Sequence, residues 1–210
     1  MSGLRIAVID YEAGNLRSVE KALQTIGASP TVTSNPAEIL AADAVVFPGQ
    51  GRCDAAMNAL NAKGLTEVVK QYIRQGKPFF GVCVGMQLLL DSSEEGEVQC
   101  LGIVPGRVRK FAPGLKVPHM GWNQVAFNTS HPVFAGVPQN SYFYFVHSYY
   151  PDPKDQSWTA GTTEYGVEFC CAVAKGNVVA TQFHPEKSGP VGLSLYANFV
   201  KFASRVTTTH

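Results

Sequence analysis

The first half of the chain alternates apolar runs with helical patterns. Residues 4–10 (LRIAVID) form a continuous apolar run, which is typical of a strand buried on both faces of a parallel sheet. Apolar residues then recur at helical spacing, and we expect Asn15 to cap this helix and Gly27 to end it. Further strands are predicted at residues 30–34, 44–47 and 78–82, and helical segments at residues 36–41, 65–75 and 86–90. This half therefore predicts repeated βα units.

From Gly106 onward the pattern changes to β-rich segments joined by glycine and proline, which favours antiparallel pairing. The predicted segments are residues 107–111, 122–127, 142–149 and 159–167, then a hairpin of residues 171–174 and 177–183, and a terminal helix at residues 191–206. The whole pattern predicts one α/β domain over residues 1–210. We expect a three-layer sandwich whose mostly parallel central sheet carries an antiparallel extension. Sites in such folds gather at the carboxyl ends of the strands.

Composition and charge narrow the classes of function. The 210 residues include 17 basic and 16 acidic side chains, and a net charge of +1 creates no strong field toward nucleic acid or an anionic membrane. The longest nearly apolar stretch, residues 79–90, is too short and too interrupted to span a bilayer. The first residues lack a signal-peptide pattern, so we expect a cytoplasmic protein. The five cysteines show no paired spacing, and we expect no disulfide framework, no metal site and no cofactor.

One cysteine lies where a nucleophile is expected. Cys83 is the centre of the segment GVCVG, at the point where a predicted buried strand meets a predicted helix. This matches the G-x-nucleophile-x-G elbow, in which glycines relieve the crowding around a strained backbone. A helix N-terminus there would favour the thiolate. The alternative is an inert core cysteine, which is the commoner role of a free thiol.

A candidate base follows the predicted strand at residues 177–183. His184 and Glu186 are two residues apart, so in an extended segment both side chains project to the same side, and Pro185 stiffens the backbone between them. Glu186 can then hold the imidazole in one tautomer, as nucleophilic catalysis requires. Taken singly, each would be read as a loop histidine or a solvated charge. No other histidine has a neighbouring carboxylate that fits the role.

The GVCVG turn followed by Met-Gln, together with the later His-Pro-Glu segment, resembles a class I (triad) glutamine amidotransferase over nearly the whole chain. The resemblance implies a flavodoxin-like fold and hydrolysis of L-glutamine to glutamate and ammonia. It implies that Cys83 attacks the side-chain amide to form a glutamyl thioester. His184 would protonate the leaving ammonia and then activate water, while Glu186 holds the imidazole.

Within this family, the segments at residues 118–123 (PHMGWN) and 144–149 (YFVHSY) and the lysine after the triad glutamate resemble the glutaminase subunits of imidazole glycerol phosphate synthases. That resemblance implies a (β/α)₈-barrel cyclase on another polypeptide, which would receive the ammonia for histidine biosynthesis. The residues matching cyclase-facing positions are Asn15, Met120, Trp122 and Lys187. Exposed tryptophan is typical of interface hot spots, although Trp122 could equally lie in the core.

Substrate and oxyanion contacts can also be assigned. By the resemblance, Gln87, His147, Ser148 and Tyr149 contact glutamine. A developing oxyanion needs preorganised backbone donors, and we expect them from Val84 after the elbow and from the loop of Gly49 and Gln50. Glycines on both sides of Gln50 would let its peptide rotate. The family usually has a small aliphatic residue where Gln50 stands.

Three alternatives remain open from the sequence. The chain could serve another nitrogen acceptor, against which the PHMGWN segment argues. It could be an α/β hydrolase with cysteine in the elbow, although there the carboxylate precedes the histidine, whereas Glu186 follows His184. It could also be an inactive scaffold that only binds a partner. The presence of Cys83, His184 and Glu186 together argues against the last.

Overall fold

The computed structural model of the protein describes residues 3–12 and 15–208 and contains a mixed sheet of nine strands. These strands are β1 (Ile6–Ile9), β2 (Pro30–Thr33), β3 (Ala44–Gly49), β4 (Phe79–Cys83), β8 (His119–Phe127), β9 (Ser141–His147), β11 (Thr159–Glu164), β12 (Glu168–Lys175) and β13 (Val178–Thr181). Their order across the sheet is β2-β1-β3-β4-β13-β12-β11-β8-β9. The neighbours from β2 to β13 run parallel, and those from β13 to β9 run antiparallel. The predicted α/β sheet with an antiparallel extension is confirmed.

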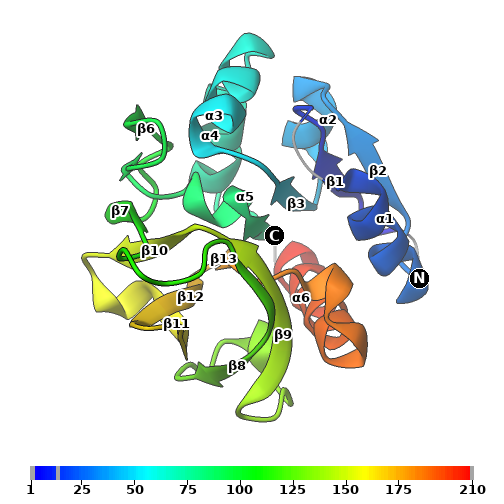
Figure 1. Cartoon of the computed structure of the whole chain (residues 1–210). Helices are drawn as coiled ribbons and strands as arrows, with labels where there is room; N and C mark the ends of the chain where they lie inside the picture. Colours follow the sequence, from blue (N-terminus) through cyan, green and yellow to red (C-terminus); the bar gives the residue numbers. More distant parts are fainter. Residues whose placement is uncertain (1–2, 13–14, 209–210) are drawn as a thin grey trace.

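Helices cover both faces of the parallel part. They are α1 (Leu16–Thr25), α2 (Pro36–Ala41), α3 (Cys53–Ala62), α4 (Thr66–Arg74), α5 (Val84–Gln87) and α6 (Gly189–Thr208). On one face α1 contacts α6, and on the other α4 contacts α2 and α3, which gives the expected three layers (Figure 1). The strands between them are apolar: every residue of β1, β3 and β4 is buried, as the continuous apolar runs predicted.

The sequence pattern did not predict α3. Its inward face consists of Cys53, Ala56, Met57 and Leu60, at helical spacing but made largely of small side chains. Small side chains contribute little to the hydrophobic periodicity of a helix, so the sequence pattern did not indicate α3. The predicted cap of α1 is present, because the Asn15 side chain accepts a hydrogen bond from the Ser18 backbone N–H.

A second, smaller sheet was also not predicted. It has the order β10-β7-β5-β6 and consists of β5 (Ser92–Ser93), β6 (Val98–Gln99), β7 (Gly106–Lys110) and β10 (Tyr149–Pro153). The single strand expected at residues 142–149 is wrong: the chain leaves the large sheet after β9, passes Ser148 and enters the small sheet as β10. Each half of the segment has its own pairing partner, so the backbone must turn at Ser148. This turn brings residues 147–149 to the edge of a cavity.

Candidate active site

The elbow at Cys83 forms as the sequence predicts. β4 ends at Cys83, whose backbone adopts φ 55° and ψ −112°, a strained left-handed conformation, and α5 begins at the next residue. Gly85 has no room for a side chain, because a Cβ atom there would lie 1.9 Å from the carbonyl oxygen of Phe47. The turn therefore depends on close contact between α5 and β3. It holds the Cys83 side chain at the carboxyl end of the parallel strands, where β13 also ends.

The second group of predicted residues follows β13. His184 Nδ1 lies 2.8 Å from Glu186 Oε1, and both side chains are buried. The extended segment expected here is wrong, because Pro185–Lys187 form a 3-10 turn, and this turn brings the two side chains together. The other carboxylate oxygen of Glu186 accepts a hydrogen bond of 3.3 Å from the Tyr196 hydroxyl. Burial alone would lower the pKa of His184, but the negative charges of Cys83 and Glu186 outweigh it and raise that pKa to about 10.

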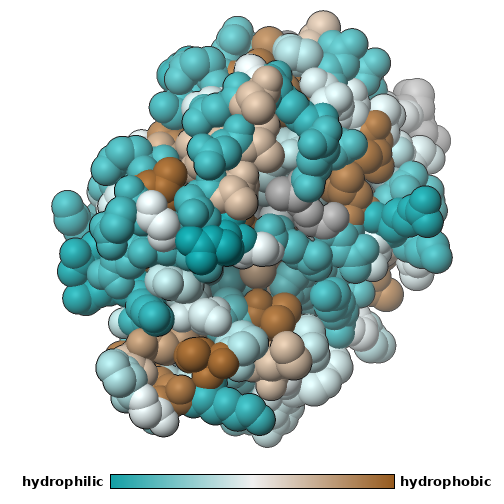
Figure 2. Space-filling model, turned by 45° about the horizontal axis from the view of Figure 1, so that its top comes forward, coloured by the Kyte–Doolittle hydropathy of each residue, from teal (hydrophilic) through white to brown (hydrophobic). Residues whose placement is uncertain are grey.

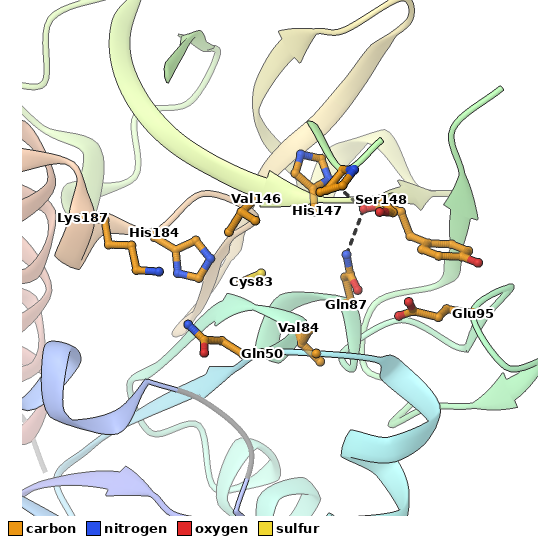
Figure 3. Close-up of a pocket in the computed structure, with 13 residues that line it drawn as sticks. Gln50, Cys83, Val84, Gln87, Glu95, Val146, His147, Ser148, His184 and Lys187 are labelled. Carbon is orange, nitrogen blue, oxygen red and sulfur yellow. Dashed lines mark hydrogen bonds between the residues drawn. The ribbon is translucent and has the colours of Figure 1, made fainter. Parts of the chain in front are cut away.

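The two groups meet in one cavity of about 390 Å³. Cys83 and His184 both line it, and the His184 imidazole points toward Cys83 (Figure 3). Nε2 of His184 is buried and hydrogen bonds to no atom of the described chain. Nucleophilic cysteine catalysis needs an imidazole with one ring nitrogen bonded to a carboxylate and the other available to the thiol. His184 has this arrangement.

The remaining predicted residues divide between this cavity, its immediate surroundings and the outer surface. Those that line the cavity are Gln50, Val84, Gln87, His147, Ser148, Tyr149 and Lys187. Gly49 pairs in register with Cys83 on the neighbouring strand, and Glu186 lies behind His184. Residues that sequence reasoning missed also line the cavity, namely Gly51, Glu95, Pro118 and Val146. Three of these had a signal in the sequence, since Gly51 flanks Gln50, Pro118 begins the PHMGWN segment and Val146 lies within the YFVHSY segment, whereas Glu95 had none.

Comparison with known proteins decides the family. The model of the family described as "Glutamine amidotransferase class-I" matches residues 7–202. The chain belongs to the class I glutamine amidotransferases. A protein named imidazole glycerol phosphate synthase subunit HisH from Synechococcus sp. (strain JA-3-3Ab) is 50% identical over 98% of this chain and 97% of its own. The protein of the same name from Geobacter sulfurreducens is also 50% identical, over 93% of this chain and 97% of its own.

Solved structures agree on the fold of this amidotransferase. A crystal structure described as a glutamine amidotransferase superposes with a TM-score of 0.75 at 19% identity, covering 96% of this chain and 100% of that one. PurLQS from Thermotoga maritima gives 0.74 at 16% identity, covering 95% of this chain and 99% of that one. At such identities the likeness concerns the fold alone. The family match favours the amidotransferase interpretation of the elbow over the α/β-hydrolase alternative.

A buried histidine of the cavity wall, His147, is supported by a second buried histidine, His119. His147 Nδ1 donates to the carbonyl of Tyr149 (2.8 Å), so its Nε2 must accept, and His119 Nδ1 donates to it across 2.9 Å. Both ring nitrogens of His147 are thus already used within the protein. Burial lowers the pKa of His147 to about 3 and that of His119 to about 4, so the pair is neutral at physiological pH.

The neutral pair predicts a pH-dependent stability. Unfolded histidines titrate near 6.5, whereas the fold holds His119 neutral down to about pH 4, so the unfolded state binds more protons in this window. The free energy of unfolding should fall as the pH drops from 6.5, by about 1.4 kcal/mol per pH unit for each histidine near pH 5. His119→Phe should reduce that slope by about this amount in denaturant titrations at pH 7, 6 and 5. Equal slopes for the two proteins would contradict the assignment.

An apolar strip lies on the outer surface beside the cavity. We define it by Met120 and Trp122 on β8, which are 62% and 56% exposed, and Tyr142 on β9, which is 55% exposed. Lys187 connects the strip to the cavity, because its Nζ atom lies 5.8 Å from the Tyr144 ring, which contacts Trp122. Figure 2 shows hydrophobic side chains gathered in small groups on an otherwise hydrophilic face that is hollowed near its centre. Trp122 is therefore a surface residue and not part of the core.

No helix within residues 3–12 and 15–208 is both long and apolar enough to cross a membrane. In the same ranges, no three side chains among histidine, cysteine, aspartate and glutamate form a group that could hold a metal ion.

Proposed function

We propose that this chain is the glutaminase subunit of an imidazole glycerol phosphate synthase. It hydrolyses L-glutamine to glutamate and ammonia and passes the ammonia to a cyclase subunit in histidine biosynthesis. The observation that carries the chemistry is the convergence of Cys83 and the hydrogen-bonded His184 and Glu186 on one cavity. The identity of about half with relatives of that name, over nearly the full length of both chains, supports the partner and the pathway.

The triad residues take successive roles in two steps. The Cys83 sulfur attacks the side-chain carbonyl of glutamine, the C–N bond breaks, and the proton on His184 Nε2 passes to the leaving ammonia. Water then attacks the thioester, His184 accepts its proton, and the Cys83 thiolate leaves with glutamate as the product. A pKa of about 10 for His184 supports a proton on Nε2 at neutral pH while the thiolate is present. Glu186 holds the imidazole by its bond to Nδ1.

The oxyanion formed in each step needs backbone donors. We assign them to the N–H of Val84 and to the peptide between Gly49 and Gln50, since Val84 and Gln50 line the cavity and Gly49 pairs with Cys83. Gly51 adopts φ +83°, a conformation that other residues rarely take, so the backbone beside Gln50 can turn sharply there. Loss of one such donor typically costs about 2.7–4 kcal/mol of transition-state stabilisation.

Glutamine is recognised by groups around the same cavity. We assign Gln87, His147, Ser148 and Tyr149 to substrate binding, because all four line it. Both ring nitrogens of His147 and both amide N–H groups of Gln87 are engaged within the protein. His147 therefore contributes through the backbone it holds, and Gln87 through the packing of its side chain against the substrate. Glu95, which the sequence analysis missed, adds a negative charge to the wall. That charge complements the α-ammonium group of an amino acid.

The cyclase is expected to cover the apolar strip. We propose that this partner is a (β/α)₈ barrel on another polypeptide, that it contacts Asn15, Met120, Trp122 and Lys187, and that the complex is cytoplasmic. Asn15 lies at the start of α1, which contacts the turn that carries Lys187. A sealed interface is needed because ammonia in bulk water mostly becomes ammonium and loses its nucleophilic lone pair. A nucleic acid or membrane partner is not part of this proposal.

Truncation within the strip tests the interface. Trp122→Ala should weaken binding of the cyclase by at least about 30-fold, because large exposed aromatic side chains contribute about 2 kcal/mol or more at hot spots. Titration calorimetry with the purified cyclase measures the change. Val167→Ala is the matched control, since Val167 is also an exposed apolar residue but lies outside the strip. Equal affinities for the Trp122→Ala variant and the unmodified chain would overturn the assigned surface.

The activity itself is tested by measuring glutamate release from glutamine, with and without the cyclase and its ligand. Glutaminase activity that rises when both are present supports the proposal. Release of glutamate only with a different acceptor enzyme would reassign the partner but keep the chemistry. Ester hydrolysis without glutaminase activity, or no turnover under any condition, would overturn the proposed function.

A further inference from the structure

A row of buried polar side chains leads to the sulfur of Cys83. Cys53 begins α3, Gln87 ends α5, and Gln182 directly follows β13. The Cys53 thiol donates to Gln87 Oε1 (3.0 Å), Gln87 Nε2 donates to Gln182 Oε1 (2.8 Å), and Gln182 Nε2 donates to Cys83 Sγ (3.5 Å). Gln87 and Gln182 are almost completely buried. Three elements from different parts of the sequence thus build one hydrogen-bonded row.

The direction of this row is fixed by groups that cannot reverse their roles. Gln87 Nε2 also donates to the backbone carbonyl of Tyr149 (3.0 Å), which can only accept, so the amide nitrogen must face that side. Gln87 Oε1 then faces Cys53, whose pKa is raised by burial, so that it remains a thiol and a donor. The second N–H of Gln87 meets Gln182 Oε1. The amide nitrogen of Gln182 is therefore the atom that faces Cys83.

We propose that Gln182 is a further catalytic residue, whose side-chain N–H donates to the sulfur of Cys83 and stabilises its thiolate form. The inference rests on the proposed function, since it assumes that Cys83 is the nucleophile. A donor interacts more strongly with a charged sulfur than with a neutral one, so it favours the thiolate before attack. It also stabilises the sulfur as it leaves the thioester. The bond fixes the position of the sulfur within the cavity as well.

The placement of Gln182 follows from the strand that carries the base. Gln182 and His184 are two residues apart in the segment that directly follows β13, and both side chains are directed toward Cys83. One strand end thus supplies both a neutral donor and an ionisable base to Cys83. From the sequence alone, Gln182 is only one more residue of an apolar strand, and its contact becomes visible when the elbow is placed beside it.

The test is the rate of alkylation of Cys83 by iodoacetamide between pH 5 and 10, with the adduct located by mass spectrometry. Gln182→Met keeps the volume and removes the donor. If the donor favours the thiolate about tenfold, its loss lowers the fraction of thiolate about tenfold wherever the thiol form dominates. The thiolate that remains is about threefold more nucleophilic, because nucleophilicity rises with basicity with a Brønsted coefficient of about 0.4–0.5. Alkylation should therefore be about threefold slower at the acidic end of the range, where the thiol form dominates, and about threefold faster on the plateau at high pH. The two rate profiles should cross.

Two further variants separate this effect from general damage. Gln182→Leu also lacks the donor and should give the same crossing if the methionine variant folds poorly. Thr181→Val is the control, because Thr181 is buried next to Gln182 but donates to the carbonyl of Phe183 and not to Cys83. It should lower thermal stability without a crossing.

A profile for both Gln182 variants that superposes on the unmodified protein, with Cys83 still essential for turnover, would overturn this inference alone. Normal turnover by Cys83→Ala would instead overturn the proposed function.

Discussion

Glutamine turnover by the Cys83→Ala variant is expected to fall by at least about 10⁴-fold, since removal of a covalent nucleophile leaves only the background provided by binding and oxyanion contacts. Cys83 is held at a strained turn beside the cavity, and among the residues that the structure describes no other cysteine lines that cavity. The measurement is glutamate formed in the presence of the cyclase and its ligand. Binding of the cyclase should be unchanged, because the apolar strip is intact.

The matched control for this variant is Cys100→Ala. Cys100 is a free thiol that lies outside the cavity, and its replacement should leave turnover near the original value. In the unmodified protein, rapid acid quenching during turnover should trap a glutamyl adduct on the peptide that contains Cys83. Turnover by Cys83→Ala within a few-fold of the unmodified chain, or an adduct on another cysteine, would show that the nucleophile has been misassigned.

Glu186→Gln is expected to reduce turnover by about 10²- to 10⁴-fold while leaving the fold intact. Glu186 Oε1 accepts the hydrogen bond from His184 Nδ1. An amide at this position can present its N–H to Nδ1 instead, which favours the neutral tautomer that carries its proton on Nε2, so that Nε2 cannot accept a proton from the thiol or from water. One of the two negative charges that raise the pKa of His184 is lost as well. The same glutamate assay measures the loss, and circular dichroism checks the fold.

Tyr196→Phe provides the comparison for Glu186. It removes only the hydrogen bond to the second carboxylate oxygen and keeps the charge and the bond to His184. Its effect on turnover should be several-fold at most, well below that of Glu186→Gln. Equal losses for the two variants would mean that Glu186 acts through packing rather than through the imidazole.

The parts of the fold that depend on local pattern could be predicted from the sequence. Continuous apolar runs predicted β1, β3 and β4, and the strand-to-helix junction with two glycines predicted the elbow. The order His-Pro-Glu after a strand predicted a hydrogen bond that the structure contains. Each of these features depends on only a few neighbouring residues. Such local dependence is visible in the sequence as hydrophobic periodicity or as characteristic turn residues.

The parts that depend on distant contacts could not be predicted. β5 and β6 have only two residues each and exist because they pair within the small sheet. Glu95 reaches the cavity from the loop between them, and Gln182 reaches Cys83 from a strand 99 positions away in the sequence. No local pattern distinguishes either residue from a surface acid or a strand amide. The catalytic assignments remain predictions for the experiments above.

The position of Glu95 has a consequence for redesign. Cys83 and His184 lie at the ends of strands of the large sheet, whereas Glu95 lies in the short loop between β5 and β6 of the small sheet. Libraries that vary residues 94–97 can therefore alter which amide-bearing molecules enter, while the reactive sulfur and its imidazole keep their support. This loop is therefore the first segment to vary when the enzyme is engineered to accept a nitrogen donor other than glutamine.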